Sequence, residues 1–387
     1  MYYKKHLVFT AACIGMLLFG IELITLGSVA GDLRNKFQLN EEGSGVLFSI
    51  LPLGILIGSI VFGPIADRFG YKWLLVFSCL GFFLGFEGIA FSTSLNELKI
   101  SIFSIGIFGG IINGGTNAMV ADISKESKGA NLSLLGVFFG IGALGMPFVL
   151  GILKKNYSFE EIIKYTGILI ALTCLFYLVI RFPLAKLAEG IPLKKSKDLF
   201  KQPLLILIGL FLFCQSSYEA LINNWTTTYL SGHFLIAKER TLYALSLSVA
   251  GLTLMRLLIG SIFRSLSPSM LLTVSFSLLL IGNLLFSIGP NYYLLTTGLV
   301  LLGMGLAGGF PIMLGIVGEK FSERSATAFS FVLLFALTGN MLLNYLAGVV
   351  AAKWGIGQLR TIIFLEYIVM IILSVLIFRQ LRSKDNK

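Results

Sequence analysis

The chain contains twelve apolar runs that are each long enough to cross a membrane as a helix, and these runs limit its fold more than any other feature. About 20 mostly apolar residues span the hydrocarbon core of a bilayer. The runs are continuous rather than alternating, which favours helices over the strands of a barrel. With 56% hydrophobic and 13% charged residues, the chain has more apolar surface than a soluble protein could bury. We therefore expect an all-α membrane protein with spans at residues 7–30, 44–66, 71–92, 98–121, 130–153, 161–182, 202–230, 239–262, 268–288, 291–319, 325–353 and 357–380.

The first run contains the tripeptide SVA before Gly31, which could pass for a signal-peptidase site. A signal peptide has an apolar core of only about 7–15 residues. This run is longer and includes Glu22, so we expect an uncleaved helix. Most Lys and Arg residues fall in segments that share one side when both termini are cytoplasmic, and the positive-inside rule favours that orientation. We expect a multi-pass protein of the bacterial cytoplasmic (inner) membrane.

The two halves of the chain resemble each other. The pair GG at 114–115 recurs at 308–309, and SKESKGA at 124–130 is similar to SERSATA at 322–328, both about half a chain apart. Such spacing favours two parallel repeats of six helices. We expect an N-terminal six-helix bundle at residues 1–182, a basic cytoplasmic linker at 183–201 and a C-terminal six-helix bundle at 202–387.

Several functional classes are disfavoured by the sequence. The formal net charge is +11, but Lys and Arg lie between apolar segments, which argues against nucleic acid as a partner. All four cysteines lie in apolar runs without CxxC spacing, and with only two histidines we expect no metal site. GMGLAG at 303–308 fits a dinucleotide pattern only inside a span, and no nucleotide-binding or hydrolase motif occurs. We expect no enzymatic activity, no cofactor and a functional monomer in the lipid bilayer.

The stretch GPIADRFGYK at 63–72 is a charged segment between two apolar runs. It closely resembles the signature of the major facilitator superfamily, which lies in the cytoplasmic loop between helices 2 and 3. The resemblance implies a twelve-helix carrier that works by alternating access. It also implies a conformational latch on the cytoplasmic side, formed here by Gly63, Asp67, Arg68, Gly70 and Lys72.

Helix 7 is expected to carry the richest set of polar residues inside the membrane. Gln215, Glu219 and Asn223 are spaced i, i+4, i+8 and so share one helix face, with Asn224 and Trp225 beside them. Amides and a carboxylate can bind the hydroxyl groups of a sugar, and an aromatic ring can stack on its apolar face. The alternative is that these amides join helices together.

Two other predicted helices repeat this amide spacing. Asn113 and Asn117 lie at i, i+4 in helix 4, and Asn340 and Asn344 do so in helix 11. In the superfamily, helices 1, 4, 7 and 10 line a central cavity and helices 2, 5, 8 and 11 flank it. The resemblance therefore implies that all three polar stripes face one solute-binding space.

Ionisable groups inside a bilayer cost about 2.5 kcal/mol or more and are functional candidates by default. Glu22 in helix 1 and Glu219 in helix 7 are the best candidates for proton coupling, with Arg256 in helix 8 as the counter-charge of Glu219. Glu87 and Glu366 lie in helices that are usually peripheral in the superfamily, and we expect them to be peripheral.

Three segments narrow the resemblance further. The pattern Glu219, Trp225, Tyr229 in helix 7, the sequence around Asn117 in helix 4 and GMGLAGGFP in helix 10 resemble the fucose-permease branch of sugar:proton symporters. We therefore expect a secondary active transporter for a sugar or similar small polar solute, coupled to protons. The alternatives are a proton-driven exporter of amphipathic compounds and, in a different class, a membrane sensor that binds solute without moving it.

Overall fold

The computed structural model describes residues 3–124, 128–183, 201–289, 291–321 and 325–385, and every regular element in these ranges is a helix. The elements are α1 (Lys5–Ser28), α2 (Ala30–Phe37), α3 (Glu41–Phe69), α4 (Tyr71–Phe91), α5 (Leu95–Ile123), α6 (Lys128–Leu153), α7 (Phe159–Val179), α8 (Pro203–His233), α9 (Lys238–Gly260), η3 (Ile262–Ser265), α10 (Pro268–Ser287), α11 (Tyr292–Leu306), α12 (Gly309–Lys320), α13 (Ser325–Trp354), η5 (Ile356–Gln358) and α14 (Leu359–Asp385).

Polar residues start several of these helices where the chain turns. Ser94 begins α5 and Ser158 begins α7, each in a capping box in which the serine oxygen accepts from a backbone N–H and a glutamate bonds back. The side chain of Asn40 accepts from the Gly43 N–H at the start of α3. Such caps satisfy donors that the first helical turn leaves unpaired.

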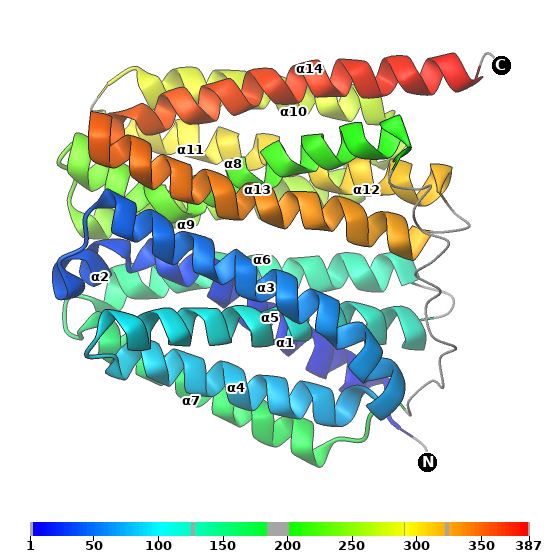
Figure 1. Ribbon diagram of the computed structural model, residues 1–387, viewed down its shortest axis with the longest axis horizontal. Coiled ribbons are helices and arrows are strands. Elements are labelled where there is room, and N and C mark those ends of the chain that lie inside the picture. Colours follow the sequence, from blue (N-terminus) through cyan, green and yellow to red (C-terminus); the bar gives the residue numbers. More distant parts are fainter. Residues whose placement is uncertain (1–2, 125–127, 184–200, 290, 322–324, 386–387) are drawn as a thin grey trace.

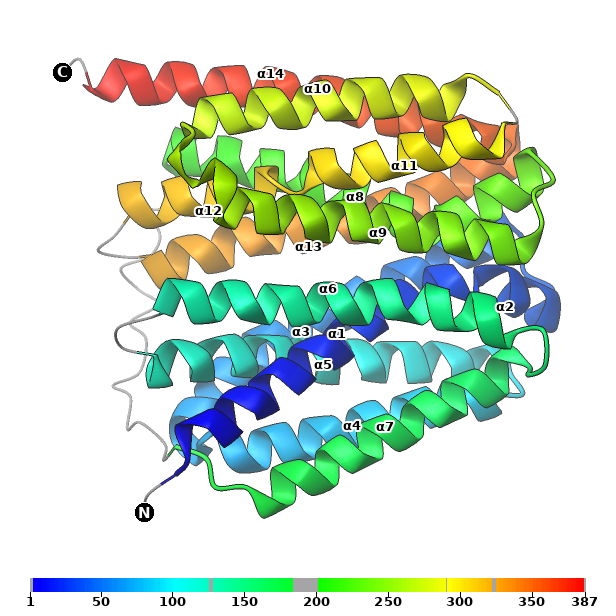
Figure 2. The ribbon, with the colours of Figure 1, turned by 180° about the vertical axis from the view of Figure 1, so that it is seen from behind.

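Within the described residues, twelve helical segments are long and apolar enough to cross a membrane, which confirms the predicted spans. Large apolar side chains such as Phe77, Leu172 and Leu365 are exposed on the outside of the assembly, where lipid takes the place of water. The helices run side by side, and both chain termini lie at the same end of the molecule (Figures 1 and 2). We call this the termini end and the opposite end, where α2 lies, the α2 end.

Two details differ from the expected elements. The tenth span is not one helix over 291–319 but two, α11 and α12, interrupted at Ala307 and Gly308. The cause is Pro311, which lacks an N–H and whose ring clashes with the carbonyl four residues earlier, at Ala307. The short helix α2 follows the first span directly and was not predicted.

Around residues 63–72 the structure has a one-residue turn in place of the expected loop. Helix α3 continues through residue 69 and α4 begins at Tyr71, so Gly70 alone makes the turn. Its φ of 78° is a backbone conformation that favours glycine, which confirms the predicted role of Gly70 in a tight turn. The tyrosine hydroxyl at 71 donates to the Asp122 carboxylate at 2.8 Å, which ties α4 to α5 at the termini end.

Helix packing follows the order of the two halves. In the first half α3 packs on α5, α1 on α6 and α4 on α7, and in the second half α8 packs on α13 and α14, while α11 packs on α9 and α10. Contacts between the halves come mainly from the pairs α3–α13, α6–α9 and α1–α8. The division into bundles at 1–182 and 202–387 stays a prediction, and the expected basic linker lies almost wholly outside the described residues.

At the α2 end the halves touch backbone to backbone. A Cβ on Gly45 of α3 would lie 2.9 Å from the Asn344 carbonyl oxygen and 3.0 Å from the Gly348 Cα of α13. The Ser49 hydroxyl donates to the Met341 carbonyl oxygen at 2.8 Å, across the same seam. Only glycine permits so close an approach, so the structure is closed at this end.

We expect Gly45→Val to prevent this closure, because its side chain would meet the α13 backbone. Spin labels at Glu42→Cys and Lys353→Cys, both exposed positions, should then show a longer mean distance than in the unsubstituted protein in a background lacking the native cysteines. Gly145→Val is the matched control, since a Cβ there has open space. An unchanged distance in Gly45→Val would show that the seam does not depend on the glycine contact.

Candidate solute and proton site

The predicted charge pair is present at the seam between the halves. Glu219 of α8 and Arg256 of α9 form an ion pair with an N–O distance of 3.8 Å, and both side chains are only partly buried. The Arg256 guanidinium also lies over the Phe139 ring of α6, 5.8 Å from its centroid. The pair therefore belongs to the second half, while its cation rests on an aromatic ring of the first half.

A small cavity of about 20 Å³ opens beside this pair. It is lined by Glu219 and Asn223 of α8, Ser248 of α9, and residues of the first half that include Leu23 and Phe139. A space of this size holds about one water molecule and has polar partners for it. The structure thus places the Glu219–Arg256 pair and Asn223 at a cavity of water size between the halves.

The amides of α8 and α13 form a separate buried cluster. The Asn344 side-chain oxygen accepts from the Asn224 amide and from the Trp225 indole N–H, both at 3.1 Å. The Asn344 amide donates to the Asn340 backbone oxygen at 2.8 Å. Phe48 of α3 packs edge-on against Trp225 with ring centroids 5.2 Å apart, so the cluster supports the seam at the α2 end.

The helix 4 amides lie in the first half. The Asn117 amide donates to the Asn113 backbone oxygen at 2.9 Å and to its side-chain oxygen at 3.0 Å. The same amide lies 3.7 Å from the Met16 sulfur of α1. Both asparagines are half-buried in the C-terminal half of α5.

Gln215 is bonded to the protein rather than open to a cavity. It is buried, and its amide donates to the Leu306 carbonyl oxygen at 2.7 Å, at the interruption between α11 and α12. The carbonyl freed by the helix break therefore gains a partner inside the membrane. In this conformation Gln215 supports the broken helix.

Glu22 lies inside the first half. It is fully buried, and its carboxylate rests against Gly109 of α5, where a Cβ would collide with it. Neither carboxylate oxygen has a hydrogen-bond partner among the residues that the structure describes. Glu22 faces α5 inside the first half, whereas Glu219 pairs with Arg256 of α9 at the seam. The two acids therefore do not share one site here.

The nine predicted solute-binding residues divide into two groups by exposure. The half-buried ones are Asn113, Asn117, Glu219, Asn223 and Asn340, and the buried ones are Gln215, Asn224, Trp225 and Asn344. The buried ones are bonded to other protein groups, and of the half-buried ones Asn117 bonds Asn113 while Glu219 pairs with Arg256. A single pocket shared by all three stripes stays a prediction.

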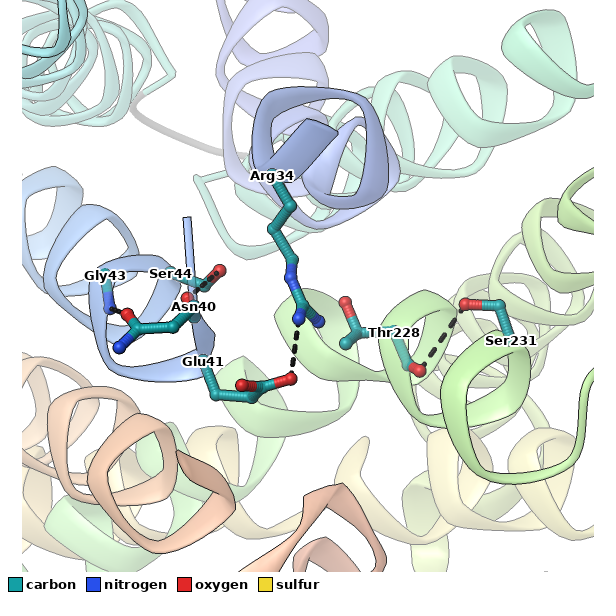
Figure 3. A network of polar contacts seen from close by, with 7 residues as sticks. All are labelled: Arg34, Asn40, Glu41, Gly43, Ser44, Thr228 and Ser231. Atoms are coloured by element: carbon teal, nitrogen blue, oxygen red, sulfur yellow. Dashed lines mark hydrogen bonds and ion pairs between the residues drawn. The ribbon is translucent and has the colours of Figure 1, made fainter. Parts of the chain in front are cut away.

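The network at the α2 end was not predicted. Helix α2 bears three charged residues that each pair with a different segment of the first half: Arg34 with Glu41 of α3 at 2.6 Å, Lys36 with Glu160 of α7 at 3.3 Å, and Asp32 with Lys154 in the turn after α6. Figure 3 shows the Arg34 side chain between Glu41 and Thr228 of α8. The available signal was the charged residue at every second position, Asp32, Arg34 and Lys36, in the segment AGDLRNKF.

The predicted latch is only partly visible. Gly63, Asp67 and Arg68 lie in the last turns of α3, but their surroundings lie outside what the structure describes. Lys72 begins α4, and its ammonium lies 5.9 Å from the Trp73 ring centroid. The latch remains a prediction.

The comparisons agree with this architecture. Residues 11–284 match the family described as "Major Facilitator Superfamily". The chain is 24% identical over 383 residues to the "Protein TsgA homolog" of Buchnera aphidicola subsp. Schizaphis graminum, which covers 95% of each chain. It is 22% identical over 377 residues to the "Inner membrane transport protein YdiN" of Escherichia coli, which covers 93% of this chain and 87% of that protein. A solved "D-xylose-proton symporter" superimposes with a TM-score of 0.77 at 14% identity, over 96% of this chain and 97% of that one.

The chain belongs to the major facilitator superfamily. It is a transporter of that class rather than an enzyme, and a multi-pass protein of the inner membrane.

We expect Asn344→Ala to destabilise the protein, because it leaves the buried Asn224 amide and Trp225 N–H without an acceptor. Each unpaired buried donor costs about 1–3 kcal/mol. Thermal unfolding in detergent should show a clear fall in the melting temperature. Asn340→Ala should have a smaller effect, because its backbone oxygen still accepts from Asn344. Equal stability of both variants would show that the cluster is not a structural support.

Proposed function

We propose that this transporter couples proton movement to the symport of a small polar solute such as a sugar, by alternating access. The observation that carries the proposal is the Glu219–Arg256 ion pair at the seam, beside a water-sized cavity that touches both halves. A titratable acid in this position can respond to solute, to water and to the relative movement of the halves at once.

Proton coupling follows from the charge balance of this pair. When Glu219 is ionised it neutralises Arg256, and when it takes up a proton the pair is lost. Arg256 then keeps only its contact with the Phe139 ring across the seam. Protonation thereby weakens the attraction between α8 and α9 and leaves the charge of Arg256 unneutralised beside the first half. Glu22, buried without a partner, is the second acid we assign to coupling.

The half-buried amides support a hydroxylated solute. Asn113, Asn117, Asn223 and Asn340 have side chains with hydrogen-bond donors and acceptors inside membrane-spanning helices, and such groups suit sugar hydroxyls. The resemblance to the fucose-permease branch and the fold shared with the D-xylose–proton symporter favour the same solute class. We place both termini in the cytoplasm by the distribution of Lys and Arg, so the closed α2 end faces outward.

We expect Glu219→Gln to abolish uphill solute uptake driven by a pH gradient in proteoliposomes, because a permanently neutral side chain cannot release a proton. Solute exchange without a gradient should persist, because the amide keeps the shape of the carboxyl group. The solute for this assay comes from a thermal-shift screen of monosaccharides on purified protein.

Glu87→Gln is the matched control, since Glu87 is half-buried on α4 against α7, away from the seam. Uphill uptake by Glu219→Gln at the unsubstituted rate would exclude Glu219 as the coupling site. Stabilisation by lipophilic cations but by no sugar would instead favour the exporter, and binding without flux would favour a sensor.

A further inference from the structure

Besides Glu22 and Glu219, a further acid, Glu366, is buried inside the second half, where the superfamily pattern led us to expect a peripheral residue. Glu366 of α14 is only 7% exposed and faces α8, so that expectation is wrong for Glu366. One carboxyl oxygen is hydrogen-bonded to the Ser217 hydroxyl, and the other has no partner among the described residues. No Lys or Arg in the described part of the chain forms an ion pair with it.

The hydrogen count at Ser217 bears on the charge of this group. The Ser217 hydroxyl oxygen lies within hydrogen-bond distance of two acceptors, the Cys214 carbonyl oxygen at 3.0 Å and the Glu366 carboxyl. A serine hydroxyl has one hydrogen and can donate only once. If Glu366 carries a proton it can donate this proton to the Ser217 oxygen, whose own hydrogen then bonds the Cys214 carbonyl, so that each contact has its own hydrogen. If Glu366 is ionised, the two acceptors must share the single Ser217 hydrogen.

Apart from the Ser217 hydroxyl, the described surroundings of Glu366 contain no cation that would stabilise a negative charge. The titratable groups nearby are Cys214 and Tyr218 of α8 and the adjacent Tyr367. Helix α10 has no titratable residue and contributes the Asn283 side-chain oxygen, which accepts from the Tyr218 hydroxyl at 3.0 Å. Helix α13 has only Tyr345 and Lys353, neither paired with Glu366, and η5 has none. An ionised carboxylate without a cation would be strongly disfavoured here.

Helix α8 connects this acid to the seam. Ser217 and Glu219 are two residues apart, which on a helix of 3.6 residues per turn places them about 200° apart, on opposite faces. One face holds the Glu219–Arg256 pair and the other holds Ser217 against α14. A movement of α8 at the seam therefore also changes the contact between Ser217 and Glu366.

The repeat relates this site to Glu22. At the spacing that separates the two GG pairs, Ser217 occupies the position of Glu22 to within one residue. Each half thus holds a buried carboxyl in contact with its first helix: Glu22 lies on α1 itself and rests against Gly109 of α5, whereas Glu366 of α14 bonds Ser217 of α8.

We propose that Glu366 holds a proton in this conformation and is a second-half proton-binding group of the transport cycle, bonded to Ser217 of α8. The first part stands on the geometry alone, and the second rests on the proposed proton coupling. Glu366 releases its proton when a movement of α8 removes Ser217 and admits water.

The protonated state is tested by infrared spectroscopy of the purified protein at neutral pH. The spectrum of the unsubstituted protein minus that of Glu366→Gln should contain the C=O stretch of one protonated carboxylic acid. Glu87→Gln is the control and should leave the band at that frequency in place. If Glu366→Gln does not fold, Ser217→Ala keeps the acid and should shift the same band, because the hydrogen bond is lost. A spectrum without any such loss or shift would overturn the proposal.

The role in transport is tested by counting protons taken up per solute molecule in proteoliposomes. Glu366→Gln should move fewer protons per solute than the unsubstituted protein, and an equal number would overturn this role. Solute flux without any proton movement in the unsubstituted protein would instead refute the proposed coupling. The infrared result would still decide whether Glu366 holds a proton, so the two failures are distinguishable.

Discussion

The absence of water from the hydrocarbon core is the constraint on which the rest of this structure depends. Backbone groups there must find partners within the protein, which leaves continuous helices as the default. The one span that breaks, between α11 and α12, does so at a glycine pair before Pro311 and recruits Gln215 to bond the Leu306 carbonyl. A glutamine that looks like a ligand for solute is, in this conformation, a replacement for a missing backbone bond.

Helix α8 concentrates the polar chemistry of the molecule. Successive faces of this one helix bond the broken span through Gln215, the α14 acid through Ser217, the α9 arginine through Glu219 and the α13 amide through Trp225. Near its far end the Thr227 hydroxyl donates to the Gly27 carbonyl oxygen of α1 at 2.6 Å, across the seam. Any displacement of α8 is therefore felt in both halves, as coupling between a proton site and a conformational change requires.

Much of the architecture is readable from the sequence, because span length and hydropathy follow from bilayer thickness. The pairing of Glu219 with Arg256 was also predictable, since two opposite charges in adjacent spans must neutralise each other. Side-chain direction was less accessible. Helical spacing placed Gln215 and Glu219 on one stripe, but it could not show that the Gln215 amide bonds the Leu306 carbonyl at the helix break.

Other misses have local causes that composition does not report. Glu366 is buried because α14 turns that face to α8, which depends on packing rather than on its own sequence. The break in the tenth span had a visible signal in Pro311 and the preceding glycines, as did α2 in its charged residues.

The three ion pairs of α2 are all formed with residues of the first half, and its neighbour across the seam, Thr228 of α8, has a hydroxyl without a hydrogen-bond partner among the described residues. Figure 3 shows this asymmetry around Arg34. Among the described residues, ion pairs therefore attach α2 to the first half, whereas it only packs against α8 of the second half. Separation of the two halves at the α2 end would break none of these three ion pairs. It would leave the Arg34 guanidinium of α2 at the mouth of the opening, on the side that faces Thr228 of α8.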